Sequence, residues 1–287
     1  MKASGNALPY LRSATSPHAS AERWLGVIWL LAVATFGCWL VGSRALDIGS
    51  DTETYAGFFE SLDQGVPETR LEPGFAYLSY GLRLLGLGVP GYQAVLFALL
   101  LVGVAIAVRI HHRAFPPTQA YPTLLCASLL LLFISPMFVN ASINAIRQGL
   151  AAPLVFAALL CFQQRRWWGF ALLGALAASL HVSSLLYLVC APALLLKPNL
   201  LRTLAALAFV AYVSGLSMKV VGAVSPTLYT TVMEYTANDN YRAGVRIDFA
   251  VFTIFWYVVV LAVSPWVQPA ARKPLQDGAS VYLVMVV

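Results

Sequence analysis

The chain contains several apolar runs that are long enough to cross a lipid bilayer as helices. A transmembrane helix needs about 20 mostly apolar residues, and such runs cover 24–42, 92–109, 120–139, 143–163, 203–218 and 249–267. Of all residues, 60% are hydrophobic and only 10% are charged, whereas a soluble domain carries about 25% charged residues. The sequence therefore predicts an all-α polytopic membrane protein.

Two other apolar runs do not match the length of one span. The run 75–88 is too short, and we expect a short amphipathic or re-entrant helix at the outer face, with one apolar side made of Phe75, Leu78, Leu82 and Leu85.

The run 167–196 is too long for one ordinary span, and it fits a hairpin of two arms of about 21 Å each. One long tilted helix is the alternative. The chain ends inside an apolar stretch at 280–287, so either a helix stops abruptly there or the chain is truncated. With the hairpin, the sequence predicts about eight or nine transmembrane helices.

Basic residues set the predicted orientation, because Lys and Arg gather on the cytoplasmic side of membrane proteins. Five clusters hold 11 of the 18 basic residues and only two of the twelve acids: Lys2/Arg12/Arg23, Arg109/Arg113, Arg165/Arg166, Lys197/Arg202 and Arg272/Lys273. Residues 1–23 then form a disordered cytoplasmic tail and 24–287 the integral membrane domain, with outer loops at 43–74 and 219–248. The net charge is +6, and the basic residues that produce it lie in short clusters between apolar runs, as membrane topology requires. We therefore expect no nucleic-acid partner.

The cysteines and histidines show no pattern of a metal site or a disulfide framework. The four cysteines, Cys38, Cys126, Cys161 and Cys190, all lie inside apolar runs, which is typical of small buried side chains. We therefore expect no metal and no cofactor.

Arg147 begins an apolar stretch, INAIRQGLAAPLVFAALLCF (143–162), where a charge costs roughly 2.5–3.5 kcal/mol. The predicted topology compensates this cost, because it places further polar residues on the same, outer side. They come from the first loop, the helix junction, the hairpin tip and the last loop: Arg44, Asp47, Asp51, Tyr55, Glu72, Asn144, Gln148, His181, Ser184, Tyr241, Arg242, Arg246 and Asp248. Spacings of four, three and one place Asn140, Asn144, Arg147 and Gln148 on one helical face. We interpret the set as the lining of a shared polar cavity.

Each of these residues also has a structural interpretation. Arg147 can pair with a carboxylate or cap a helix, and His181 can be a packing histidine. Asp51 or Thr52 can cap a helix that starts at DTETYAGFF. The tyrosines of the last loop can belong to an interfacial aromatic belt.

Arginines in a recessed outer cavity suit phosphate, which guanidinium groups bind through paired hydrogen bonds. A carboxylate or histidine beside them can act as general base toward a hydroxyl. The sequence has no P-loop, no GxSxG and no dinucleotide fingerprint. This combination favours a substrate that carries an activated phosphate leaving group on a lipid.

Five segments in order resemble the EpsG family of Wzy-like polysaccharide polymerases, over roughly 44–255. They are RALDIGSDTETYAGFF, EPGFAYLSYGLRLLG, NAIRQGLAAPLVF, LAASLHVSSLLYL and YRAGVRIDFAVF, of which the RQGLA and LHxSS elements are the most specific.

The resemblance implies a glycosyltransferase-C-like architecture in the bacterial plasma (inner) membrane, with a cytoplasmic N-terminus. It implies a glycosyltransferase that joins oligosaccharide repeats carried on undecaprenyl pyrophosphate into exopolysaccharide, capsule or O-antigen. A chain-length regulator and a flippase of the same pathway are the expected partners.

The resemblance also suggests roles for single residues. Arg147 would stabilise the pyrophosphate, with Arg44 and Arg246 as the next candidates, and His181 would orient the acceptor or the phosphate. Asp51 is the preferred base, with Glu72 and Asp248 in reserve.

Other functions fit the sequence less well. A transporter or flippase would distribute its polar residues over both faces and show an inverted repeat. A ligase, which transfers finished glycan to another acceptor, uses the same leaving group and is hard to separate from a polymerase. A purely structural membrane subunit is the last alternative.

Overall fold

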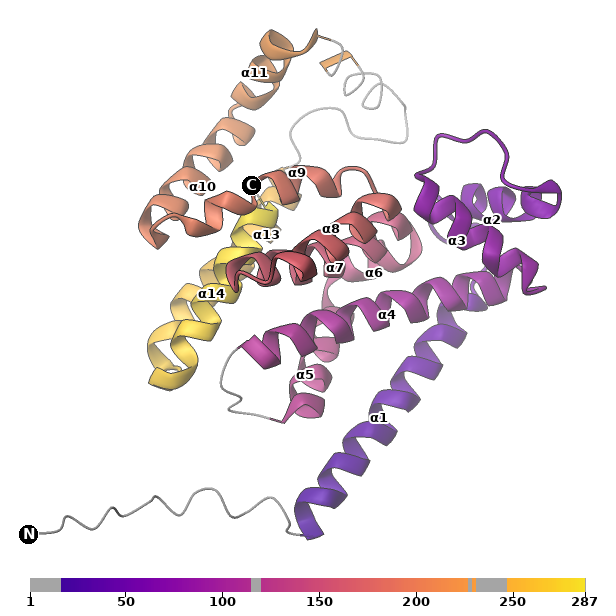
Figure 1. Ribbon diagram of the computed structural model, residues 1–287, viewed down its shortest axis with the longest axis horizontal. Helices are drawn as coiled ribbons and strands as arrows, with labels where there is room; N and C mark the ends of the chain where they lie inside the picture. The colour runs from indigo at the N-terminus through magenta and orange to yellow at the C-terminus, as the bar shows by residue number, and fades with distance from the viewer. Residues whose placement is uncertain (1–16, 115–119, 227–228, 231–246, 287) are drawn as a thin grey trace, which may run out of the picture. The chain divides into compact units, whose positions relative to one another are not determined.

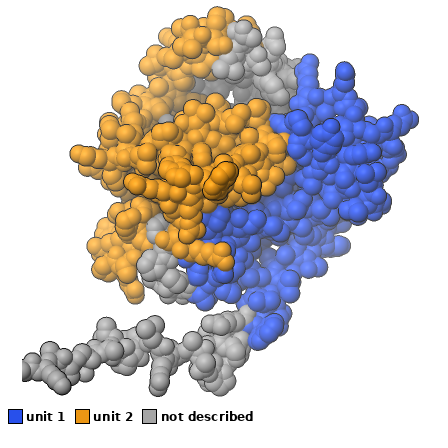
Figure 2. Space-filling view, viewed as in Figure 1, with its two compact units in different colours: residues 1–112, 117–153 blue, residues 113–116, 154–287 orange. Residues whose placement is uncertain are grey.

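A computed structural model describes residues 17–114, 120–226, 229–230 and 247–286, and all regular elements of these residues are helical. The chain forms two compact units, residues 1–112 with 117–153 and residues 113–116 with 154–287 (Figure 2). Helix α7 (Ile146–Gln163) runs from the first unit into the second. The prediction of an all-helical chain is thus confirmed for the described residues.

In the described part of the first unit, the following elements precede α7 in the sequence (Figure 1). They are α1 (Pro17–Gly42), α2 (Thr52–Glu60), the 3-10 helix η2 (Ser61–Gln64), α3 (Pro73–Leu84), α4 (Val89–Ala114), α5 (Tyr121–Ile134) and α6 (Pro136–Ile143). Helix α1 begins before the predicted span at Trp24.

The second unit holds the end of α7 and the helices that follow it. They are α8 (Trp167–Leu180), α9 (Ser184–Val189), η3 (Ala191–Leu195), α10 (Pro198–Val213), α11 (Leu216–Val224), α13 (Ile247–Val263), η4 (Ser264–Trp266) and α14 (Pro269–Val286). Helices α13 and α14 pack together, and the Tyr282 hydroxyl of α14 donates to the Thr253 carbonyl of α13 at 2.9 Å.

Three helices of the described residues are long and apolar enough to span a membrane: Trp24–Gly42 within α1, α4 and α7. The number rises to five if the bent pairs α5–α6 and α10–α11 each count as one span. The chain is therefore a helical membrane protein.

The predicted span 120–139 is broken between α5 and α6, which meet at 83°. Pro136 opens α6, and Ser135 before it has extended backbone angles (φ −78°, ψ 118°). A residue that precedes proline is driven out of the helical region by a clash with the proline ring.

The predicted span 203–218 is broken in the same way, at an angle of 89° between α10 and α11. Gly215 lies between them with a φ of +72°, a left-handed conformation that glycine adopts without steric cost. The predicted outer loop 219–248 therefore starts within a helix, since α11 continues to Val224.

The segment 167–196 forms the predicted hairpin. In one continuous helix Gly174 and Leu188 would be about 21 Å apart, yet a Cβ on Gly174 would lie 3.2 Å from the Leu188 side chain. The Ser184 hydroxyl also donates back to the Ala177 carbonyl at 3.4 Å. Because the chain turns back at His181–Ser183, one long helix is excluded.

The turn between α7 and α8 contains Arg165 with a φ of +59°, the one non-glycine residue with positive φ in the described chain. The amide of Arg165 donates to the Phe162 carbonyl and that of Arg166 to the Cys161 carbonyl, at 2.9 and 2.8 Å. This pattern is the Schellman motif, whose left-handed position usually holds glycine.

The short helix predicted at 75–88 corresponds to α3, which ends at Leu84. Helices α2 and α3 both pack against the start of α4. The rings of Phe59 and Tyr92 stack at a centroid distance of 4.1 Å, and the Tyr92 hydroxyl lies 2.9 Å from that of Ser79. Of the predicted apolar side, Phe75 and Leu82 are buried, whereas Leu85 follows the end of α3 and is 74% exposed. This packing fixes the loops on either side of α2 and α3.

Candidate active site

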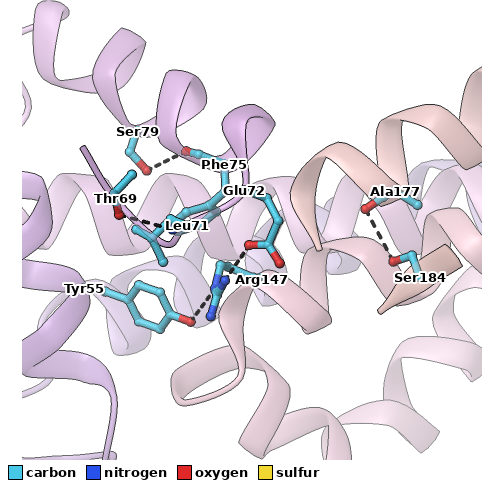
Figure 3. A network of polar contacts seen from close by, with 9 residues as sticks. All are labelled: Tyr55, Thr69, Leu71, Glu72, Phe75, Ser79, Arg147, Ala177 and Ser184. Atoms are coloured by element: carbon cyan, nitrogen blue, oxygen red, sulfur yellow. Dashed lines mark hydrogen bonds and ion pairs between the residues drawn. The ribbon is translucent and has the colours of Figure 1, made fainter. Parts of the chain in front are cut away.

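Arg147 lies in the first turn of α7 and contacts two predicted site residues from distant parts of the sequence (Figure 3). Its Nε donates a hydrogen bond to the Tyr55 hydroxyl at 3.1 Å. Its NH1 group forms a short ion pair with the Glu72 carboxylate. Tyr55 comes from α2, and Glu72 is the residue just before α3. We call these three residues the Arg147 cluster.

The break between α6 and α7 determines where Arg147 lies. Helix α6 ends at Ile143 and α7 starts at Ile146. A side chain at Gly149 would fall within 3.0 Å of the Ala141 carbonyl oxygen and at 3.1 Å from its carbon. Glycine therefore allows the backbone of α6 to press against the first turn of α7, which fixes the direction in which Arg147 points.

The Arg147 cluster is largely removed from solvent, with the Arg147 and Glu72 side chains 22% and 10% exposed. A guanidinium group has five N–H donors, and Arg147 donates two hydrogen bonds within the described residues. Burial raises the pKa of the Tyr55 phenol, against the opposing hydrogen bond from Arg147, so Tyr55 is neutral at physiological pH. The cluster thus offers one shielded cation with donors to spare.

Arg44 lies in a second polar network, made mostly of backbone carbonyls. Its NH1 donates to the Val41 carbonyl at 2.8 Å, and its NH2 to the Ile143 carbonyl and the Thr52 hydroxyl, both at 3.3 Å. Val41 lies in the last turn of α1 and Ile143 ends α6, and the helix dipole favours cations at such C-terminal ends. Burial lowers the pKa of Arg44, but a guanidinium group stays protonated in proteins, so Arg44 remains charged. Arg44 therefore ties two helix ends to the start of α2.

Asn144 lies next to the polar network of Arg44. It lies at the end of α6, and its Nδ2 donates to Asn140 Oδ1 at 2.8 Å. Gly49 packs against it with a φ of +100°, and a side chain at Gly49 would overlap Asn144 Oδ1 and reach within 2.7 Å of the Thr52 hydroxyl. The loop after α1 is thereby fixed on the end of α6.

The predicted face formed by Asn140, Asn144, Arg147 and Gln148 is wrong as a continuous helical face. Asn140 and Asn144 belong to α6, whereas Arg147 and Gln148 belong to α7 beyond the break. Gln148 is exposed. Arg147 reaches its partners because the break redirects the chain.

The two aspartates of the first loop lie near the start of α2. Asp51 is half-buried, occupies the N-cap position and makes no side-chain cap hydrogen bond, while its carboxylate accepts one from Ser50 at 3.1 Å. The backbone amide of Tyr55 bonds to the Asp51 carbonyl, one turn away. Asp47 is exposed. Asp51 is the aspartate that lies beside the Arg147 cluster.

His181 and Ser184 lie in the second unit, at the turn of the α8–α9 hairpin. His181 ends α8 in an extended conformation and is half-buried. The Ser184 side chain is buried inside the hairpin, where its hydroxyl bonds to the Ala177 carbonyl (Figure 3). Tyr241, Arg242 and Arg246 lie outside the described residues, as does the side chain of Asp248. No group of three or more His, Cys, Asp or Glu side chains suited to a metal occurs among the described residues.

Sequence reasoning overlooked two residues that hold the site. Thr52 is 1% exposed and lies within hydrogen-bond distance of the Ile48 and Ile143 carbonyls, at 2.7 and 3.2 Å, so it joins the loop to α6 and is more than a helix cap. Gly149 permits the close approach of α6. The RQG sequence carried a signal for it, since a glycine inside a helix often marks such an approach.

Comparison with known proteins identifies a family for this chain. The sequence model of the EpsG family matches residues 27–287, nearly the whole chain. No curated protein and no solved structure matches the chain. From the matched range, which includes the whole Arg147 cluster, it follows that this protein belongs to the EpsG family of Wzy-like polysaccharide polymerases.

Proposed function

We propose that the protein polymerises oligosaccharide repeats carried on undecaprenyl pyrophosphate, at the outer face of the bacterial plasma membrane. The observation that carries the proposal is the shielded Arg147 cation in an apolar chain, which uses two of its five N–H donors on described residues. Family membership supports the same function. On this proposal the N-terminus is cytoplasmic, the chain has eight or nine spans of glycosyltransferase-C-like arrangement, and a chain-length regulator and flippase act beside it.

In the proposed reaction the growing glycan is the donor, and a hydroxyl of the next lipid-linked repeat is the acceptor. The acceptor oxygen forms a bond to the anomeric carbon, and the bond from that carbon to the pyrophosphate oxygen breaks. The leaving group gains negative charge as the bond breaks. Preorganised donors in a site shielded from water stabilise such charge far better than water does, and this is the role we assign to Arg147.

The acceptor hydroxyl must lose its proton to a base. Glu72 already accepts a hydrogen bond from Arg147, and is thus less available for a proton. Asp51 is half-buried and beside the cluster, so we propose Asp51 as base. His181 is proposed to orient the acceptor, and Arg246 to assist at the phosphate.

The test is the glycan profile of strains whose only copy of the gene encodes Arg147→Ala, with Arg70→Ala as control. Arg70 is an exposed cation in the loop that precedes Glu72. Extracted polymer and lipid-linked intermediates are separated by size, and a blot checks protein levels. We expect Arg147→Ala to abolish long chains and accumulate single-repeat lipid at the outer face, and Arg70→Ala to leave the profile unchanged.

The other outcomes identify the other functions. Normal long chains in Arg147→Ala would show that Arg147 is structural. In a deletion strain, single-repeat lipid trapped at the cytoplasmic face would indicate a flippase. Finished polymer that remains on its lipid carrier would indicate a ligase.

A further inference from the structure

The ion pair of the Arg147 cluster raises a question about the proposed function, because it places a carboxylate where the substrate's pyrophosphate would bind. Arg147 and Glu72 are in direct contact, and Glu72 is the more buried of the two. A buried guanidinium without a counter-anion would suffer a large desolvation penalty. Glu72 supplies that anion while no substrate is bound.

The carboxylate of Glu72 has no part in capping α3. Glu72 occupies the N-cap position of α3 but makes no side-chain cap hydrogen bond, although acidic residues at this position commonly accept one from the first-turn amides. Instead the side chain points to Arg147 (Figure 3). Pro73 in the first turn sets the helix start through its fixed φ. A change of charge at Glu72 should therefore leave α3 in place.

Tyr55 holds the guanidinium independently of Glu72. The Tyr55 hydroxyl accepts a hydrogen bond from Nε, while the Glu72 carboxylate accepts one from NH1 on another side of the guanidinium group. Tyr55 is 6% exposed, and its ring packs edge-on against Phe75 at 5.6 Å. Because Nε stays anchored, the anion beside NH1 can be exchanged while Arg147 keeps its position.

We infer that Glu72 is a resident counter-anion that the donor pyrophosphate displaces from Arg147 and that later helps to expel the product. This inference rests on the proposed function. A diphosphate carries more charge and more acceptor oxygens than a carboxylate, and guanidinium–phosphate pairs are strong, so the donor wins the exchange. After transfer the Glu72 carboxylate competes with undecaprenyl pyrophosphate for Arg147, and this competition speeds product release.

The inference predicts opposite effects of two substitutions in the same cluster. Glu72→Gln keeps the shape and removes the competing charge, so undecaprenyl pyrophosphate should bind about tenfold tighter, as expected when roughly 1.4 kcal/mol of competition is lost. Turnover should slow through product inhibition. Tyr55→Phe removes the anchor of Arg147 and should weaken binding. A purely structural cluster would instead respond in the same direction to both changes.

The experiment measures the affinity of the purified full-length protein in detergent for undecaprenyl pyrophosphate, beside a multiple-turnover polymerisation assay. Glu68→Gln is the matched control, since Glu68 is an exposed carboxylate in the same loop, and it should behave as wild type. Equal or weaker binding by Glu72→Gln, with wild-type protein binding normally, would overturn the inference and leave the proposed function intact. If wild-type protein neither binds the probe nor makes polymer, the proposed function fails as well.

Discussion

Replacement of Gly149 by alanine tests whether the close approach of α6 and α7 maintains the site. The new Cβ would lie 3.1 Å from the Ala141 carbonyl carbon, 3.2 Å from its Cβ and closer still to its oxygen. These partners include backbone atoms, which cannot rotate away. Overpacking of this kind typically costs about 1–3 kcal/mol, and any relaxation would move the first turn of α7 together with Arg147.

The matched control is Gly57→Ala. A Cβ at Gly57, inside α2, meets nothing within 4 Å, so this variant gains only the helix preference of alanine over glycine, about 1 kcal/mol. Because Gly149→Ala receives the same gain, the difference between the two variants isolates the clash. At about 2–4 °C per kcal/mol for proteins of this size class, the two apparent Tm values should differ by roughly 2–12 °C.

Thermal unfolding of the detergent-purified variants, followed by intrinsic fluorescence, measures this difference. Polymer yield in cells should fall for Gly149→Ala and stay normal for Gly57→Ala. If Gly149→Ala unfolds at the temperature of Gly57→Ala, α6 and α7 are not in close contact at this point. Arg147 would then not be positioned by this contact.

Two further predictions concern residues outside the Arg147 cluster. Arg165 has a φ of +59° and an exposed side chain, so Arg165→Gly should stabilise the protein by about 1 kcal/mol; an apparent Tm no higher than that of Arg166→Gly would contradict this. The hydrogen bond from Arg83 lowers the pKa of the Asp63 carboxyl. The bond therefore stabilises the fold fully above the unfolded pKa of about 3.9, and this contribution is lost as the pH falls through the lower folded-state pKa. The Tm difference between wild type and Asp63→Asn should therefore start to shrink as the pH falls below about 4 and should vanish below the lower folded-state pKa. A difference that does not shrink with falling pH would exclude this pair as its source.

The helices were predictable from the sequence because apolar length is a local property. The runs that begin at Trp24, Tyr92 and Ile143 correspond to α1, α4 and α7. The breaks were missed although their signals were present, a proline at 136 and a glycine at 215. Mean hydropathy depends only on the composition of a sequence window, and a single proline or glycine in an apolar window barely changes that mean.

The candidate site was predictable in part for a different reason. Charge asymmetry placed Tyr55, Glu72 and Arg147 on one side of the membrane, and the structure brings these three into contact. Sequence could not show that Arg44 is bound by the carbonyls of Val41 and Ile143, because every residue has a carbonyl. Only the packing of helix ends selects which of them face a guanidinium group.

The hairpin formed by α8 and the segment Ser184–Leu195 has a consequence for the lipid around it. An arm of 14 residues is about 21 Å long, whereas the hydrocarbon core measures about 30 Å. A bilayer accommodates such a hydrophobic mismatch by thinning around the shorter segment. On the proposed function, a membrane thinned in this way beside His181 would let a polar glycan reach below the level of the surrounding headgroups.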